Sequence, residues 1–214
     1  MANKYRAIQV TVPDYSEPAT AGQDGGTGAQ GSHGSSAKTH YDSGDCKTKC
    51  DTNPSDGGQG GKGGQGQPGS LGAKGTAGPV STFNIGSIDG DLSIEVSGGK
   101  GQDGGKGGKG GSGGPGGAAG NNQSPCTSAS QGPQGPGGDG GKGGDAGDGG
   151  SGPTVTVYFH EVTGNITQSI STGQPGNPGQ GGEPGTGSPD GSSGQNGGTG
   201  EVGTAPTLNV QKVS

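Results

Sequence analysis

Glycine recurs at every third position through long stretches of this chain, and this period constrains its fold more than any other feature. The segment GGKGQDGGKGGKGGSGGPGGA, residues 98–118, contains seven consecutive triplets that each begin with glycine in one register. The same period holds in four further tracts, 22–36, 57–80, 132–152 and 173–205. It matches neither the α-helix nor the β-strand, whose side chains repeat every 3.6 and 2.0 residues. The tracts therefore predict no α-helix and a largely irregular or polyproline II backbone.

The composition argues against a conventional hydrophobic core. Sixty glycines and 15 prolines occur among 214 residues, whereas leucine, isoleucine, valine and phenylalanine together contribute only 21. Such a composition usually indicates disorder. Here, however, 19 of the 21 are concentrated in four short windows, 5–13, 80–96, 154–170 and 207–213. This clustering favours a folded chain with one small apolar core.

Two known structures repeat every three residues. In the collagen triple helix, three chains wind together with glycine at the crowded axis, and proline stiffens each chain. The tracts here are short and mostly poor in proline, and the second glycine in many triplets of 98–118 adds an entropy cost without helping a triple helix. The alternative is a bundle of polyproline II helices, in which a glycine column lets neighbouring backbones approach and hydrogen-bond. We therefore predict a polyproline II bundle.

The predicted bundle has about six antiparallel arms. The longest tract breaks its register at Ser188, in GTGSPDGSS, where successive residues favour a turn. Arms 98–118 and 132–152 have two nearly all-glycine faces and should lie at the centre, with their lysine and aspartate columns facing water. The predicted arms are 22–36, 57–80, 98–118, 132–152, 173–187 and 191–205.

The four apolar windows alternate apolar and polar residues and therefore predict β-strands. The two internal windows predict hairpins that turn at Asp89-Gly90 and near Gly164-Asn165. The two terminal windows predict single strands that could serve in assembly. Their apolar residues are Ile8, Val10, Val12, Leu208, Val210 and Val213. With arms alternating in direction, these strands meet at one end as a small antiparallel β-sheet or sandwich, within a single unit of residues 1–214.

The same alternation places the loops 37–56 and 119–131, and the turn at Ser188, at the opposite end. The loops contain all three cysteines, Cys46, Cys50 and Cys126. A disulfide could join Cys46 to Cys50, or either of them to Cys126, in an oxidising compartment. Four side chains could supply metal ligands, but the C-x₃-C spacing is not that of a zinc knuckle, and we predict no metal. These side chains are His33, His40, Cys46 and Cys50. Candidate contact residues of the loops are His40, Tyr41, Asn121 and Asn122.

Charge and motif content argue against several function classes. The net charge is −6 and no basic run is present, so nucleic acid is not an expected partner. No apolar run approaches the roughly 20 residues of a membrane span. The opening MANKYRAIQVTVPDYS lacks the apolar region of a Sec signal. Glycine-rich matches to nucleotide-binding motifs neither follow a strand nor open a helix. We expect no enzyme activity, no cofactor, and an extracellular or virion-surface location.

Glycine-rich tracts that alternate with variable loops resemble two families of polyproline II bundle. The resemblance to phage tail-fibre tip adhesins implies that distal loops, here 37–56, 119–131 and 186–192, touch the host surface. These loops contain one aromatic residue, Tyr41, whereas the binding loops of that family are rich in aromatics. The resemblance to springtail antifreeze proteins implies a flat face of small residues, whereas the outward columns here carry Lys, Asp, Gln and Pro.

Three functions are therefore expected, in order of preference. The first is a structural, self-assembling building block of a fibre or filament, because unpaired strand edges are templates for strand addition. The second is a receptor-binding adhesin at a fibre tip, with a cell-surface glycan or receptor as its partner. The third is an antifreeze protein.

Overall fold

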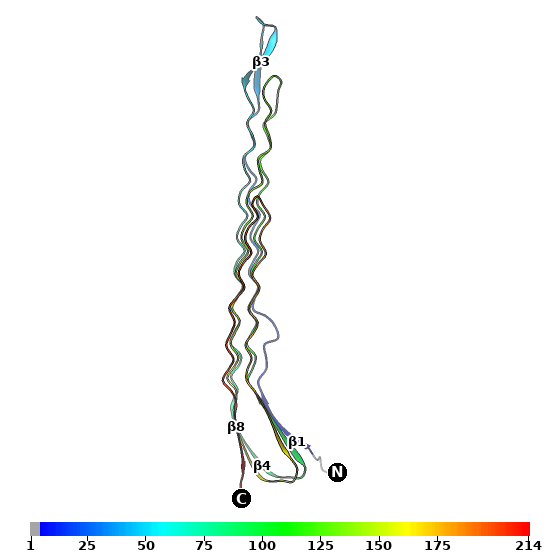
Figure 1. Cartoon of the computed structure of the whole chain (residues 1–214), viewed down its shortest axis with the longest axis vertical. Coiled ribbons are helices and arrows are strands. Elements are labelled where there is room, and N and C mark those ends of the chain that lie inside the picture. Colours follow the sequence, from blue (N-terminus) through cyan, green and yellow to red (C-terminus); the bar gives the residue numbers. More distant parts are fainter. Residues whose placement is uncertain (1–4) are drawn as a thin grey trace.

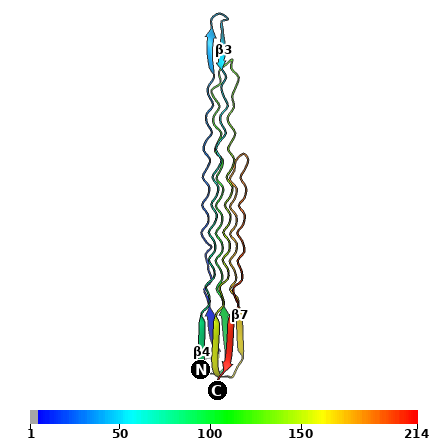
Figure 2. The same ribbon diagram turned by 90° about the vertical axis from the view of Figure 1, so that its left-hand side faces the viewer.

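The computed structural model describes residues 5–214, so positions 1–4 of the expected single unit lie outside it. The described chain forms a long rod with a small β-structure at its base and a hairpin at its tip (Figures 1 and 2). It contains short strands and no helix, and therefore no helix that could cross a membrane. The strands are β1 (Tyr5–Thr11), β2 (Lys38–Asp42), β3 (Lys47–Thr52), β4 (Val80–Ile88), β5 (Asp91–Ser97), β6 (Thr154–Val162), β7 (Ile166–Ser171) and β8 (Thr207–Lys212).

Six extended segments without regular secondary structure form the rod. We name them arms 1 to 6 in chain order, and they are residues 12–37, 53–79, 98–121, 131–153, 172–187 and 190–206. Arms 1, 3 and 5 run from the base toward the tip, and arms 2, 4 and 6 run back (Figures 1 and 2). The turn at Ser188 was expected at the tip. Because arms 5 and 6, which it joins, are the shortest, it lies part-way along the rod instead (Figure 2).

The arms form two layers held by backbone hydrogen bonds at every third residue. In the layer of arms 1, 3 and 5, the N–H groups of Gly22, Gly25 and Gly28 each donate to arm 3 at 2.8 Å, and arm 3 donates onward to arm 5 in the same way. Arms 2, 4 and 6 form the second layer with the same pattern. Neighbouring arms are therefore parallel within a layer and antiparallel between layers.

Arms 3 and 4 occupy the centre, and each is hydrogen-bonded to four other arms. Gly111 of arm 3, for example, donates to the carbonyl of Gly64 and accepts from the N–H of Gly138, both at 2.8 Å. A Cβ atom on Gly111 would lie 2.0 Å from the Gly26 carbonyl oxygen, far inside the contact distance. Most positions of the central columns thus need glycine, because a Cβ atom there would meet the backbone of a neighbouring arm; Gln102 and Ala146 are exceptions.

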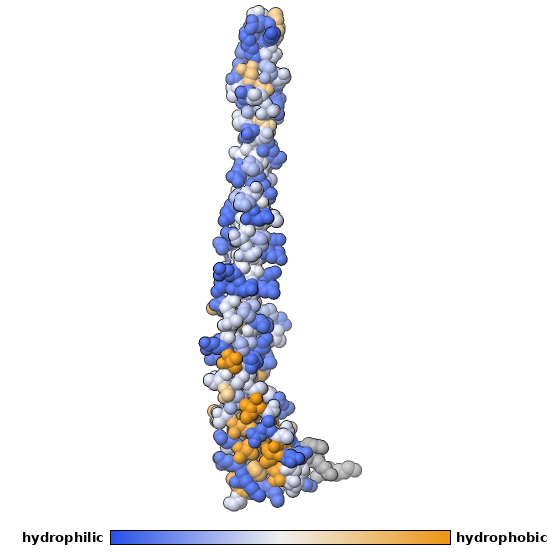
Figure 3. Space-filling model, viewed as in Figure 1, coloured by the Kyte–Doolittle hydropathy of each residue, from blue (hydrophilic) through white to orange (hydrophobic). Residues whose placement is uncertain are grey.

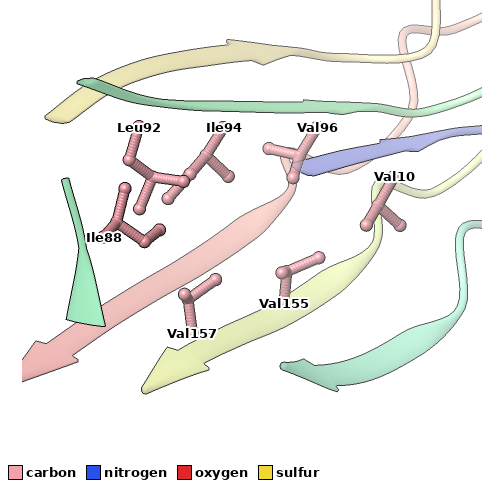
Figure 4. Close-up of a cluster of buried hydrophobic side chains, with 7 residues drawn as sticks. All are labelled: Val10, Ile88, Leu92, Ile94, Val96, Val155 and Val157. Atoms are coloured by element: carbon pink, nitrogen blue, oxygen red, sulfur yellow. The ribbon is translucent and has the colours of Figure 1, made fainter. Parts of the chain in front are cut away.

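Each layer continues into a three-stranded parallel sheet at the base. The first sheet has the order β1-β5-β7 and the second has the order β4-β6-β8. Apolar side chains fill the space between the two sheets (Figure 4), and apolar residues gather at this end of an otherwise hydrophilic rod (Figure 3). The buried cluster consists of Val10, Ile88, Leu92, Ile94, Val96, Val155 and Val157.

The predicted antiparallel hairpins at the base are wrong. β4 and β5 lie in different sheets, as do β6 and β7. The chain does reverse beside Asp89, at Gly90, whose φ of 111° suits glycine. As it reverses, however, it crosses from one layer to the other, so the two halves of each window face each other across the core. The strands pair in parallel because they extend arms that are already parallel neighbours.

One register runs through the second layer from base to tip. Val80 of β4 pairs with Thr154 of β6, which is 74 residues further along the chain. Near the tip, the carboxylate of Asp56 accepts the N–H of Ser130, again across 74 residues. The base sheet and the rod are therefore one continuous hydrogen-bonded lattice.

Candidate functional site

The candidate contact surfaces lie at the two ends of the rod. At the tip, β2 and β3 pair as an antiparallel hairpin, with Thr39 opposite Cys50. This hairpin was missed, because residues 37–56 were expected to form a loop. The alternation of KTHYD and KTKCDT around the glycine of Asp42-Ser-Gly-Asp is the pattern that could have revealed it.

Charged side chains shape the turn of this hairpin. The Asp42 carboxylate accepts the N–H of Gly44 at 2.8 Å and lies 2.6 Å from the Lys49 ammonium. Lys49 also lies 2.6 Å from a carboxylate oxygen of Asp45. Lys49, followed by the Gly44 N–H, lowers the pKa of Asp42, and the two aspartates raise the pKa of Lys49. The turn is thus ordered by ionised groups at neutral pH.

A disulfide fixes the hairpin to the loop between arms 3 and 4. It joins Cys50 of β3 to Cys126, which lies 76 residues further along the chain, and the two Cα atoms are 5.1 Å apart. The side-chain oxygen of Asn53 adds a hydrogen bond from the Thr127 N–H at 3.1 Å. Of the pairings left open by the sequence, the structure contains this one. Cys46, the remaining cysteine, is exposed and free.

The four predicted contact residues of the tip have different roles. Tyr41 of β2 is 64% exposed, which is unusual for a large aromatic side chain. His40 pairs with Asp51, and the side-chain oxygen of Asn122 accepts the Ala129 N–H at 2.9 Å. The carbonyl of Asn121 accepts the N–H of Ala37 at 3.0 Å. Tyr41 is therefore the strongest candidate of the four for contact with a partner.

The residues considered as metal ligands are not brought together. Within residues 5–214, no group of three or more histidine, cysteine, aspartate or glutamate side chains is arranged to hold a metal ion. His33 lies in arm 1, below the hairpin that carries His40, and Cys50 is committed to the disulfide.

At the base, the apolar residues of the terminal strands belong to the chain's own core. Val10 and Val12 are each 8% exposed, and Ile8, Leu208 and Val210 pack against the buried cluster. The N–H of Val213 donates to the carbonyl of Phe159 at 2.7 Å. Apart from Val213, these side chains are turned inward, whereas Val80 of β4 and Ile170 of β7 are exposed at the base.

Four strand edges are available there. β1 and β7 are the outer strands of one sheet, and β4 and β8 are the outer strands of the other. β4 and β7 contain no charged residue and no proline. Charged residues and proline are the usual protection of edge strands against pairing with other chains. The outer edges of these two strands pair with no other strand among residues 5–214 and lack this protection.

Aspartates of the outward columns make contacts that the sequence analysis missed. The carboxylate of Asp24 accepts the N–H of Lys109 at 2.7 Å, and that of Asp139 accepts the N–H of Ser192 at 2.8 Å. Each of these hydrogen bonds joins neighbouring arms of one layer. Its donor is an outward-facing backbone N–H that takes no part in the backbone hydrogen bonds between arms. The Ser192 bond, with Lys62, lowers the pKa of Asp139. Further examples are Asp14, Asp56, Asp103, Asp145 and Asp148.

No protein-family model matches the chain, and no curated protein matches it. A solved structure of a springtail antifreeze protein from Granisotoma rainieri, described as a bundle of nine polyproline type II helices, is 26% identical over 83% of this chain and 94% of that one. The TM-score of 0.13 is too low to indicate a shared fold.

Proposed function

We propose that the six arms are polyproline II helices and that the protein is a rigid, non-enzymatic building block of an extracellular or virion-associated fibre. The support for the helix type is the period of the hydrogen bonds. N–H donors from arm 1 to arm 3 recur at residues 22, 25, 28, 31 and 34. A polyproline II helix has three residues per turn and no internal hydrogen bonds, so one face points at the same neighbour in every turn.

One observation carries the structural role: a hydrogen-bonded rod separates two ends that each have their own folded structure. The disulfide-linked hairpin lies at the tip, and the apolar sandwich and both strand-bearing termini lie at the base (Figure 1). A rod stabilised by backbone hydrogen bonds along its whole length is suited to hold its ends at a fixed distance. We propose that copies assemble through the open strand edges of the base.

Electron microscopy tests this assembly. Negative-stain images at low and high concentration should show fibres or rods that are joined at their bases. Lysine on an edge strand disfavours pairing, so Thr82→Lys with Asn84→Lys, at exposed positions of β4, should reduce the assemblies. The control is Gln59→Lys with Gln65→Lys on the outward column of arm 2. Discrete rods at every concentration would count against this function.

A receptor-binding tip is the second candidate, and the exposure of Tyr41 favours it. The hairpin that carries this ring is fixed by the Cys50–Cys126 disulfide, which reduces the ordering cost of binding. Tyr41→Ala should lower binding to an immobilised glycan panel at least tenfold, whereas Tyr15→Ala, 39% exposed in arm 1, should not. Equal binding by both variants would contradict the role of the tip. Ice binding has weaker support, because the outward column of central arm 3 carries Lys100, Asp103, Lys106 and Lys109.

A further inference from the structure

The outer edge formed by arms 5 and 6 shows how the lattice ends. Within the first layer, each arm donates every third N–H to the next one, as Gly101 and Gly104 of arm 3 do toward arm 5. A further arm beside arm 5 would need the corresponding N–H groups of arm 5. The residues at these positions are Pro175, Pro178, Gly181, Pro184 and Gly187.

Arm 5 offers no free N–H group at any of these five positions. The three prolines lack an N–H altogether. The N–H of Gly181 donates to the side-chain oxygen of Asn196 at 2.9 Å, and that of Gly187 donates to the carboxylate of Asp190 at 2.7 Å. Both acceptors come from arm 6, so arm 6 occupies the N–H groups at the two positions that are not proline.

Arm 6 is closed by the bulk of its side chains. In arm 4, the column that bonds the next arm of its layer is glycine except at Ala146, and a Cβ on Gly140 would lie 2.1 Å from the Gly182 carbonyl oxygen in the opposite layer. The corresponding column of arm 6 has no glycine. Its residues are Asp190, Ser193, Asn196, Thr199, Val202 and Ala205. In a second copy placed alongside, the backbone of arm 1 would meet these side chains.

We propose that this edge is a built-in stop against side-by-side association with a second copy that points the same way, and that backbone pairing between copies is therefore confined to the base strands. Only the second part of this inference, that pairing is confined to the base strands, rests on the proposed assembly role. Proline commonly protects exposed backbone edges from pairing with other chains. Here the protection is present along arm 5. It is absent from β7, the strand that precedes arm 5, which has no proline and no charged residue.

An opened-edge variant tests the stop. It combines six changes: Pro175→Gly, Pro178→Gly, Pro184→Gly, Asn196→Gly, Thr199→Gly and Val202→Gly. A matched control carries six glycines at exposed positions of the outward columns: Pro68→Gly, Pro115→Gly, Pro133→Gly, Gln59→Gly, Thr27→Gly and Leu71→Gly. Both variants gain the same backbone freedom, but only the first restores the N–H groups and removes the bulk at the edge. Sedimentation velocity and negative-stain microscopy report their association.

The opened-edge variant should sediment as species of at least twice the monomer mass and show rods aligned side by side, whereas the wild type and the control should show no such alignment. An opened-edge variant that keeps the wild-type circular dichroism spectrum and does not align would overturn the stop. So would side-by-side rods of the wild type or the control. Should six changes prevent folding, Pro178→Gly with Asn196→Gly opens two adjacent positions and should give a smaller, concentration-dependent shift in sedimentation.

The proposed assembly at the base and the proposed stop are tested independently of each other. Loss of end-to-end contacts in the Thr82→Lys with Asn84→Lys variant reports on the base strands alone. If the wild type never assembles, the assembly role is wrong, but the comparison of opened-edge variant and control still decides the stop.

Discussion

Asp103 binds Asn177, 74 residues further along the chain, through both carboxylate oxygens: one accepts the backbone N–H at 2.8 Å and the other accepts the side-chain amide at 3.0 Å. Lys100 lies 3.0 Å from the first oxygen. Led by the bond from the Asn177 backbone, these contacts lower the pKa of Asp103 to about 2. They link the outward faces of arms 3 and 5 near the base.

The Asp103 carboxylate should make the fold sensitive to acid. Because its pKa is depressed in the folded chain, it stabilises the fold fully above its ordinary value of 3.8, and this contribution is lost as the pH falls toward about 2. Asp103→Asn keeps an acceptor oxygen but cannot titrate. Its unfolding temperature should therefore fall less than that of the wild type between about pH 4 and pH 2. Glu161→Gln, at an exposed position of β6, is the control, and equal acid sensitivity of wild type and Asp103→Asn would refute the assignment.

Central and outer glycines should respond very differently to alanine. Gly111→Ala places a Cβ 2.0 Å from the Gly26 carbonyl oxygen, so arms 1 and 3 must separate, and we expect a loss of about 1–3 kcal/mol in the free energy of unfolding. A Cβ on Gly26 itself meets nothing within 4 Å, and Gly26→Ala should change stability by less than about 0.5 kcal/mol. Thermal unfolding of both variants measures the difference. Equal destabilisation would contradict the steric explanation, because alanine in place of glycine otherwise lowers the entropy of the unfolded chain and stabilises the fold.

The disulfide should stabilise the tip against opening. Replacing Cys50 and Cys126 by serine removes a cross-link across 76 residues and should cost about 2–4 kcal/mol. Amide hydrogen exchange should accelerate in β2, β3 and residues 122–130 but remain unchanged in β5 and β6. Cys46→Ser leaves the cross-link intact and should behave as the wild type. Faster exchange at the base would mean that the tip is needed for the whole lattice to hold together.

The small core should be sensitive to truncation despite its size. Val157 of β6 is fully buried, whereas Val80 of β4 is 83% exposed. Val157→Ala should lower the free energy of unfolding by about 1.5–3 kcal/mol, from lost burial and the cavity left behind. Val80→Ala should lower it by less than about 0.5 kcal/mol. Chemical denaturation of the two variants checks this, and similar midpoints would argue that the base sandwich contributes little to stability.

The sequence could predict element types at the base but not their pairing. Alternation in the windows 80–96 and 154–170 indicated strands, and strands occur there. Alternation determines which side chains share a face, but not which strand lies alongside. The partner of β4 was decided by arm 2, which precedes it and lies parallel to arm 4. A turn at Asp89-Gly90 is equally compatible with a hairpin and with a crossing between layers.

Contacts at the candidate sites depended on distances that no local pattern encodes. Tyr41 could be singled out because it is the one aromatic residue of its loop. The choice among disulfide pairings stayed open, because three cysteines in two loops at one end satisfy several of them. The role of Asp24 was invisible, since its partner is the backbone N–H of Lys109, which any residue other than proline would supply.

The constant separation of 74 residues along the second layer has a consequence for how such a chain can change in length. An insertion of one residue in arm 2 would shift every later position of that arm to another column, and side chains would then point where only glycine fits. Insertions of whole triplets keep the columns, but arm 4 must gain the same number for the base strands to stay paired. Rod length can therefore change only in matched steps of three residues, each about 9 Å if the arms have the proposed polyproline II conformation.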